Sequence, residues 1–275
     1  MKKICAIILI TEIIIKKGGF IMWNQMHTDA YQGMLAETIS FKGHNGDMVH
    51  AYYARPLGEG PFPSLVLIAH MPGWDEWCFE TARRFAQHGY MTICPDIYCR
   101  FGHGTPSEVS TIMRNAGGVH DDCVMGDCEG ALEYLKSQQN SNGKTGVIGM
   151  CSGGRHAYLA ACTVDGFDAV VDCWGGGVVA AQEDLTPARP VAPIDYTEQL
   201  NIPLLGIFGN EDKNPIPEHV DILEEKLKEL KKEYTFYRYD DAGHGFWYYD
   251  KENYRPKQTM DSWDKVIEFF DCHLK

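Results

Sequence analysis

The residue with the clearest chemical signature in this chain is Cys151, in the segment Gly149-Met150-Cys151-Ser152-Gly153-Gly154. Residues 144–148 before it, which end in Val147 and Ile148, predict a buried strand, and residues 152–161 predict a helix. A nucleophile at such a strand-to-helix turn is flanked by glycines, because the tight turn leaves no space for other side chains. The turn also places the thiol at a helix N-terminus, where the helix dipole favours the thiolate. We therefore predict that Cys151 is a nucleophile; the alternative is a structural cysteine in a glycine-rich turn.

A cysteine nucleophile needs a base, and the base needs a carboxylate that orients it. Asp212 follows the predicted strand 203–208, and His244 follows the predicted strand 234–239. Both loops leave the carboxyl ends of strands, where the sites of open α/β sheets lie. The order nucleophile, acid, histidine is that of α/β-hydrolases. We predict a triad of Cys151, Asp212 and His244, with Glu211 as the alternative acid.

The tetrahedral intermediate of acyl transfer requires an oxyanion hole made of two backbone N–H groups. One is expected from Ser152, directly after the nucleophile, and the other from the loop His70-Met71-Pro72-Gly73 after the third strand. Because proline has no N–H group, Met71 is the predicted second donor.

The elements that must position these residues alternate between strands and helices. Two opening strands joined by a turn, followed by repeated strand-helix units, predict the α/β-hydrolase fold, a doubly wound and mostly parallel sheet with helices on both faces. The interval 174–199 is rich in glycine and proline and is predicted to be mainly loop. The predicted strands are 35–41, 48–53, 64–69, 90–95, 144–148, 167–173, 203–208 and 234–239, and the predicted helices are 76–88, two within 105–139, 152–161, 218–230 and 259–273.

From about Leu35 to Leu274, the sequence resembles the dienelactone hydrolases, also called carboxymethylenebutenolidases. The resemblance rests on the segment around Cys151, on Gly89 to Arg100, on Gly209-Asn-Glu-Asp212 and on Ala242-Gly-His244-Gly-Phe246. It implies cleavage of an unsaturated cyclic ester through a thioester on the cysteine.

The chain departs from this family in two places. The family carries a glutamate in the loop after the third strand that contacts the resting thiol, and no glutamate stands at the matching place here. The family also binds the substrate carboxylate with two arginines; Arg100 matches the first, whereas Tyr248 stands at the position of the second. The resemblance therefore implies that Arg100 binds substrate, although a structural pairing with a carboxylate such as Asp96 is the alternative.

Two aromatic residues, Trp74 and Phe246, fall in loops expected around the pocket. We expect them to form an apolar wall for the substrate, with packing over the sheet edge as the alternative.

Composition excludes several classes of function. The formal net charge is −13, so the overall field of the protein repels nucleic acid and anionic lipid. The chain has 275 residues, of which 44% are hydrophobic, so it can form a large core without a disulfide framework. The ten cysteines show no zinc-ligand spacing and are expected as free thiols in a reducing cytoplasm. We predict no metal or organic cofactor.

The first residues combine Lys2-Lys3 with an apolar run from Ile4 to Ile15 that Glu12 interrupts. Lys16-Lys17-Gly18-Gly19 is what a purine-rich stretch resembling a ribosome-binding site encodes, two codons before Met22. We predict that translation starts at Met22, that residues 1–21 are not part of the natural protein, and that 22–275 form one domain. A membrane anchor and a signal peptide are the alternatives.

Together these observations predict a cytoplasmic, cysteine-dependent hydrolase of a small-molecule carboxylic ester, a lactone or enol-lactone. The alternatives are a thiol acyl transferase or peptidase on the same fold, and a non-catalytic protein that binds an apolar small molecule. We expect a monomer or a small homo-oligomer.

Overall fold

The computed structural model describes residues 33–275, whose strands form one eight-stranded sheet in the order β1-β2-β4-β3-β5-β6-β7-β8. β1 (Met34–Lys42), β2 (Met48–Pro56) and β4 (Met91–Pro95) pair antiparallel. All other neighbours are parallel, as the alternating strands and helices predicted. These strands are β3 (Phe62–Ile68), β5 (Ser141–Met150), β6 (Ala169–Cys173), β7 (Leu204–Gly209) and β8 (Tyr234–Tyr239). The predictions for residues 1–21 and a start at Met22 lie outside the described residues.

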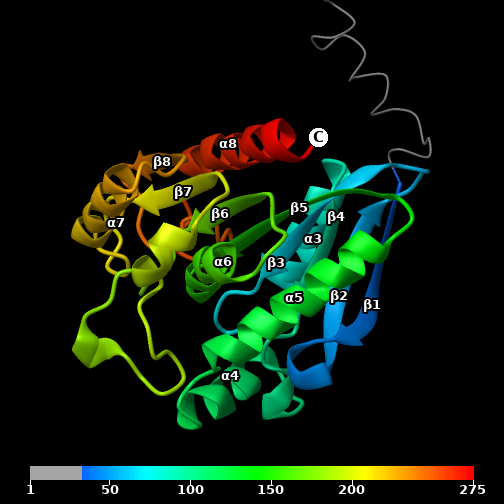
Figure 1. The fold of residues 1–275 in the computed structure, drawn as a ribbon, viewed down its shortest axis with the longest axis horizontal. Coiled ribbons are helices and arrows are strands. Elements are labelled where there is room, and N and C mark those ends of the chain that lie inside the picture. Colours follow the sequence, from blue (N-terminus) through cyan, green and yellow to red (C-terminus); the bar gives the residue numbers. More distant parts are fainter. Residues whose placement is uncertain (1–32) are drawn as a thin grey trace, which may run out of the picture.

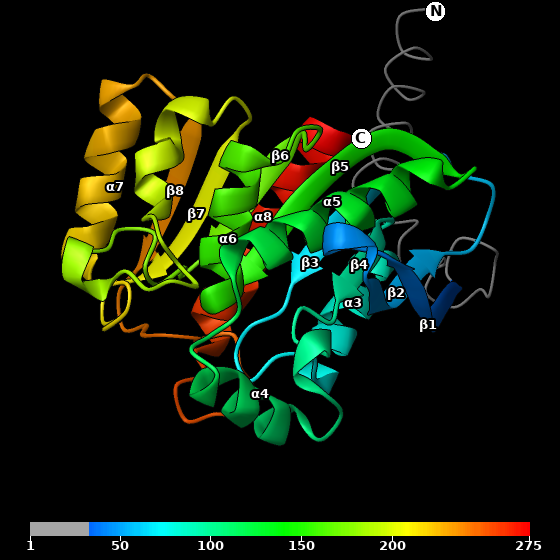
Figure 2. The same cartoon turned by 60° about the horizontal axis from the view of Figure 1, so that its bottom comes forward.

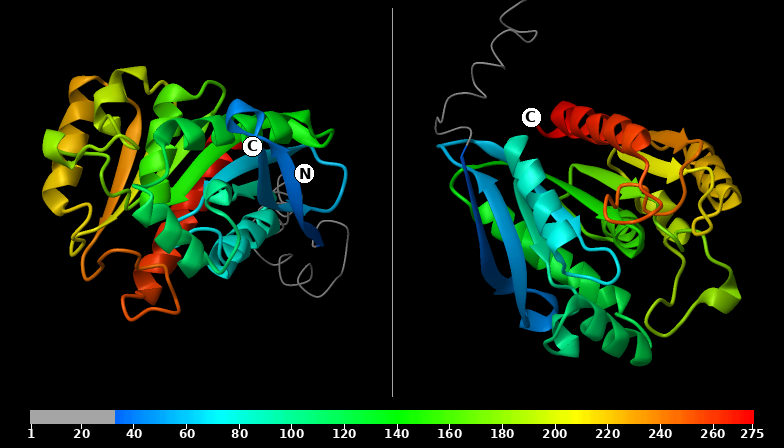
Figure 3. Two further views of the ribbon diagram at one scale, coloured as in Figure 1. Left: turned by 90° about the horizontal axis from the view of Figure 1, so that it is seen from below. Right: turned by 180° about the vertical axis from the view of Figure 1, so that it is seen from behind.

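Helices cover both faces of the sheet. α5 (Asp121–Ser137), α6 (Ser152–Thr163) and α7 (Pro217–Glu229) pack against one face (Figure 1). α3 (Glu76–Gln87) and α8 (Pro256–Leu274) pack against the other (Figure 3). α4 (Pro106–Asn115) lies beyond the sheet rather than on either layer (Figure 2). The predicted α/β-hydrolase fold is therefore confirmed.

Local sequence explains where the helices start. Asp75 is the N-cap of α3, and its Oδ1 accepts a hydrogen bond from the Cys78 N–H at 3.0 Å. Thr105 and Glu108 form a reciprocal capping box at α4, whose first residue is Pro106. Such caps satisfy N–H groups that the helix itself leaves without partners.

The predicted strands and helices are present in the structure, with small differences at their ends. β5 begins at Ser141, three residues before the predicted Lys144, and continues to Met150. Its polar start pairs with β3, and this tertiary contact is not visible in the local pattern. The loop 174–199 contains two short 3-10 segments, Gln182–Asp184 and Pro193–Gln199. Within residues 33–275, no helix combines the length and the apolar character needed to cross a membrane.

Candidate active site

Cys151 lies in a sharp turn between β5 and α6. Its backbone is left-handed, with φ 56° and ψ −123°, and its N–H donates to the carbonyl of Cys173 at 3.0 Å. A Cβ atom on Gly149 would lie 2.0 Å from the carbonyl oxygen of Gly153. One on Gly153 would lie 2.3 Å from the carbonyl oxygen of Ile68. Both glycines are therefore required for the close approach that exposes the thiol at the start of α6.

His244 and Asp212 lie together beside this turn. The His244 Nδ1 lies 3.1 Å from Oδ1 and 3.0 Å from Oδ2 of Asp212. Because an ionised carboxylate can only accept hydrogen bonds, the Nδ1 of His244 carries the proton. Its Nε2 therefore remains available to interact with the Cys151 thiol. Asp212 is 4% exposed, and its Oδ1 also accepts from the Asn214 N–H at 2.8 Å. The adjacent Glu211 side chain is exposed.

The electrostatics of the site favour an ionised thiol. Burial opposes ionisation of Cys151, but the hydrogen bond and charge of His244, with the N–H groups of Ser152 and Met71, outweigh it and lower the pKa of the thiol. Burial likewise opposes protonation of His244, but Asp212 and Cys151 outweigh it and raise the pKa of the imidazole to about 10. The two shifts have one cause, a thiolate-imidazolium pair. The same two N–H groups that contact the thiol are the predicted oxyanion-hole donors.

The loop that carries Met71 is held by residues that sequence reasoning missed. His70 Nε2 lies 2.9 Å from Asp75 Oδ2, and the His70 ring packs against Trp77 and Tyr248. Burial opposes protonation of His70, but Asp75 and Cys78 raise the pKa of the imidazole to about 9. The only signal in the sequence was a histidine five residues before an N-cap aspartate.

The same segment contains the one group of potential metal ligands found among residues 33–275. Donor atoms of His70, Asp75 and Cys78 lie within 4.8 Å of one another. The histidine-carboxylate hydrogen bond and the N-cap account for this grouping without an ion.

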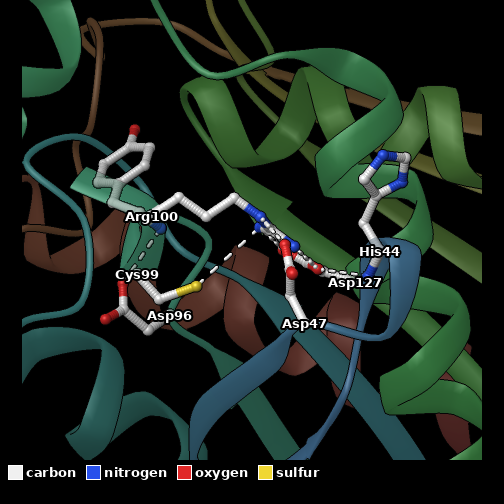
Figure 4. A network of polar contacts seen from close by, with 7 residues as sticks. His44, Asp47, Asp96, Cys99, Arg100 and Asp127 are labelled. Carbon is white, nitrogen blue, oxygen red and sulfur yellow. Dashed lines mark hydrogen bonds and ion pairs between the residues drawn. The ribbon is translucent and has the colours of Figure 1, made fainter. Parts of the chain in front are cut away.

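The guanidinium of Arg100 is bound by two carboxylates. Its guanidinium donates to Asp127 through Nη1 at 2.8 Å and Nη2 at 2.9 Å, and through Nε to Asp47 at 2.8 Å (Figure 4). Asp127 is 0% exposed and also accepts from the His44 N–H at 3.0 Å. The expectation that Arg100 binds a substrate carboxylate is therefore corrected. The arginine joins the β1-β2 turn to α5, and its partners are Asp47 and Asp127 rather than Asp96.

Of the two aromatic residues expected around the pocket, one contacts a cavity. Trp74 lines a cavity of about 190 Å³ next to the oxyanion-hole loop, together with Pro72, Asp96 and Tyr98. Phe246 is 0% exposed and packs against Trp174 and Tyr239. The expectation of a substrate-binding Phe246 is corrected, because no face of its ring is accessible.

Comparison with known proteins agrees with this geometry. A profile of the dienelactone hydrolase family matches residues 49–274. The chain belongs to the dienelactone hydrolase family. As a member of this family, the protein is a hydrolase that acts on esters or lactones.

Individual relatives support this assignment. The chain is 30% identical over 234 residues to an Escherichia coli protein named "Putative carboxymethylenebutenolidase", covering 82% of this chain and 83% of that one. It is 26% identical over 246 residues to a Bradyrhizobium protein named "Probable 2-oxo-3-(5-oxofuran-2-ylidene)propanoate lactonase", covering 88% and 98%. A Klebsiella pneumoniae structure titled "Putative Dienelactone Hydrolase" superposes with a TM-score of 0.80 at 25% identity, covering 87% of this chain and 99% of that one.

The first prediction concerns Arg100. Arg100→Met should lower the free energy of unfolding by about 3 to 5 kcal/mol, because it leaves the buried Asp127 carboxylate without its counter-ion. Arg83→Met is the matched control, since it removes an arginine whose partner Glu76 is exposed, and should cost at most about 1 kcal/mol. Urea unfolding of both variants measures the difference. Equal stability of the two would show that the Arg100 pair is not structural.

The second prediction concerns the thiolate. Alkylation of Cys151 by iodoacetamide should proceed at pH values below those of an ordinary thiol, because His244 stabilises the thiolate. In His244→Gln the pKa of Cys151 should rise, so the rate profile should move to higher pH. Peptide mass spectrometry of the Cys151 peptide across pH 5 to 10 measures this. Superimposable profiles for the two proteins would mean that His244 does not contact the thiol.

The third prediction separates the two neighbouring acids. Asp212→Asn should reduce kcat/KM about 100-fold to 10,000-fold, because the histidine loses the charge that orients it and supports its imidazolium form. Glu211→Gln should stay within about threefold of wild type, as expected of an exposed side chain away from the chemistry. Steady-state assays of both variants on one ester give the result, and the reverse order would make Glu211 the triad acid.

Proposed function

We propose that this hydrolase cleaves a carboxylic ester, a lactone or enol-lactone, through a thioester on Cys151, with His244 and Asp212 as base and orienting acid. One observation carries the proposal. Cys151 has a left-handed backbone at the β5-α6 turn, and it lies beside His244, which is hydrogen-bonded to the buried Asp212 carboxylate. An elbow of this geometry presents a nucleophile to a carbonyl carbon that approaches from outside the sheet.

The reaction follows from the positions of the groups. The Cys151 thiolate attacks the ester carbonyl, and the N–H groups of Ser152 and Met71 stabilise the oxyanion that forms. Collapse of this intermediate breaks the C–O bond, and the leaving oxygen takes its proton from the His244 imidazolium. The neutral His244 then removes a proton from water, which attacks the thioester and releases the acid and the thiol. Asp212 orients His244 in both halves.

The leaving group decides which esters suit this mechanism. A thiolate leaves readily from the tetrahedral adduct. When the alkoxide of the ester is a poor leaving group, the adduct therefore returns to substrate rather than forming the thioester. Enolates leave more easily, which favours enol-lactones over plain alkyl esters. The Bradyrhizobium relative is named for an unsaturated furanone, and we extend that class of substrate to this chain.

We also propose that the protein works in the cytoplasm. All cysteines of residues 33–275 are free thiols, several of them buried, and a thiolate nucleophile needs a reducing compartment.

The fourth prediction tests the nucleophile. Cys151→Ala should reduce ester hydrolysis at least about 1,000-fold, as removal of a triad member does. In the wild type, acid quenching during turnover of a lactone should trap an adduct that carries the mass of the whole lactone, because ring opening retains the leaving group. Peptide mapping should place it on Cys151. Activity above a tenth of wild type in Cys151→Ala, or an adduct on another residue, would reject the thioester mechanism.

A further inference from the structure

Asp172 is a buried carboxylic acid in β6, the strand between β5 and β7 (Figure 1). It pairs in register with Gly149 of β5, two residues before Cys151. Its Oδ1 accepts a hydrogen bond from the Gly175 N–H at 2.8 Å, whereas its Oδ2 has no hydrogen-bond partner among residues 33–275. A buried oxygen without a partner lowers stability, and the two preceding positions of β6 hold valine. The core of the sheet therefore does not require a carboxyl group here.

The hydrogen bond between Asp172 and Gly175 closes a turn at the end of β6, which we call the β6 turn (residues 172–175). Within it, Trp174 has a left-handed backbone with φ 43°, and its N–H donates to a carbonyl of β7 at 2.8 Å. This conformation is unfavourable for a bulky residue and persists only where the surrounding contacts impose it. The Cys173 carbonyl of the same turn accepts from the Cys151 N–H at 3.0 Å, so the β6 turn also contacts the nucleophile.

The side chain of Trp174 packs on the segment that follows His244. Its ring centroid lies 5.1 Å from that of Phe246, 5.3 Å from that of Trp247 and 6.1 Å from that of Tyr248. All four aromatic side chains are buried, so this packing leaves little freedom to either segment. Because Phe246 is only two residues after His244, the conformation of the β6 turn helps to set the position of the imidazole.

The residue directly after the β6 turn contacts the loop that carries the triad acid. A Cβ atom on Gly176 would lie 2.5 Å from the side-chain nitrogen of Asn214, so the Asn214 side chain lies directly against this glycine. The Asn214 N–H in turn donates to Asp212 Oδ1 at 2.8 Å, and Asp212 is hydrogen-bonded to His244. The segment that Asp172 holds is therefore in contact with the supports of both the acid and the histidine.

We propose that Asp172 is a positioning residue for the triad, because its carboxyl group holds the β6 turn in the conformation that places Asp212 and His244 beside Cys151. The hydrogen bond from Asp172 to the turn carries this role, and the aromatic packing and the Asn214 contact transmit it. Its effect on catalysis rests on the proposed function, but the placement of the imidazole at the thiol does not.

Three substitutions separate the hydrogen bond of Asp172 from its charge and its volume. Burial raises the pKa of Asp172 to about 7, against the hydrogen bond from Gly175, so part of the carboxyl group is uncharged near neutral pH. Asparagine has the same shape and keeps an oxygen that can accept from the Gly175 N–H, so Asp172→Asn should preserve the β6 turn. Asp172→Ala and Asp172→Val both remove the acceptor. Valine suits a buried strand, and this variant serves if the alanine variant does not fold.

The first measurement is the pH dependence of Cys151 alkylation by iodoacetamide, read from the mass of the Cys151 peptide. In Asp172→Ala the profile should move about one pH unit higher, the equivalent of one hydrogen bond, because His244 stabilises the thiolate less well. The Asp172→Asn profile should overlay that of the wild type. Asp168→Ala is the matched control. Asp168 directly precedes β6 at the opposite end of the strand and accepts from the Thr145 N–H at 2.8 Å, so its loss should leave the profile unchanged.

The second measurement is steady-state turnover of one ester. Asp172→Ala should lower kcat about 10-fold to 100-fold and change KM less than about threefold, because a displaced imidazole slows the chemistry more than it weakens binding. Asp172→Asn should stay within about threefold of wild type. An unchanged alkylation profile in the alanine or valine variant, or an equal shift in Asp172→Asn or Asp168→Ala, would overturn the role of Asp172. If the profile shifts as expected but the wild type hydrolyses no ester, the positioning role stands and the proposed function fails.

Discussion

The active site depends on how closely β5 and α6 approach each other at the turn around Cys151. The left-handed backbone of this cysteine is tolerated because Gly149 and Gly153 leave the space in which carbonyl groups of the turn and of β3 lie. The same approach points the helix N-terminus at the sulfur and places the Ser152 N–H beside it. A single steric constraint thereby fixes the position of the thiol and of one N–H group of the proposed oxyanion hole.

The charged groups of the protein differ in how much of their hydrogen-bonding capacity is already used by protein partners. Arg155 and Asp121 form a buried bidentate pair, and the half-buried Arg100 binds the buried Asp127 in the same bidentate way. His244 is held by the Asp212 carboxylate through Nδ1 only, which leaves its Nε2 free of any carboxylate. The saturated pairs stabilise the loops, whereas His244 keeps one ring nitrogen for the chemistry proposed at Cys151.

Much of the fold was predictable because its signals are local. Buried parallel strands appear as continuous apolar runs, and capping residues mark helix starts, so the order and type of the elements followed from periodicity. The cysteine, histidine and aspartate that lie together were also identifiable as candidates, since each follows a strand in a loop of characteristic composition. The pairing of the polar start of β5 with β3 was not, because register with a neighbouring strand has no local signature.

The sequence by itself determined which residues are the candidates for the chemistry: Cys151 between its glycines, and Asp212 and His244 after their strands. Only the tertiary structure decided which charged groups remain free. Arg100 matched a family pattern, yet Asp47 and Asp127 from the β1-β2 turn and α5 occupy it. The reason is physical. The sequence does not show whether an arginine is paired, because its interaction energy depends on carboxylates that only folding brings within contact distance.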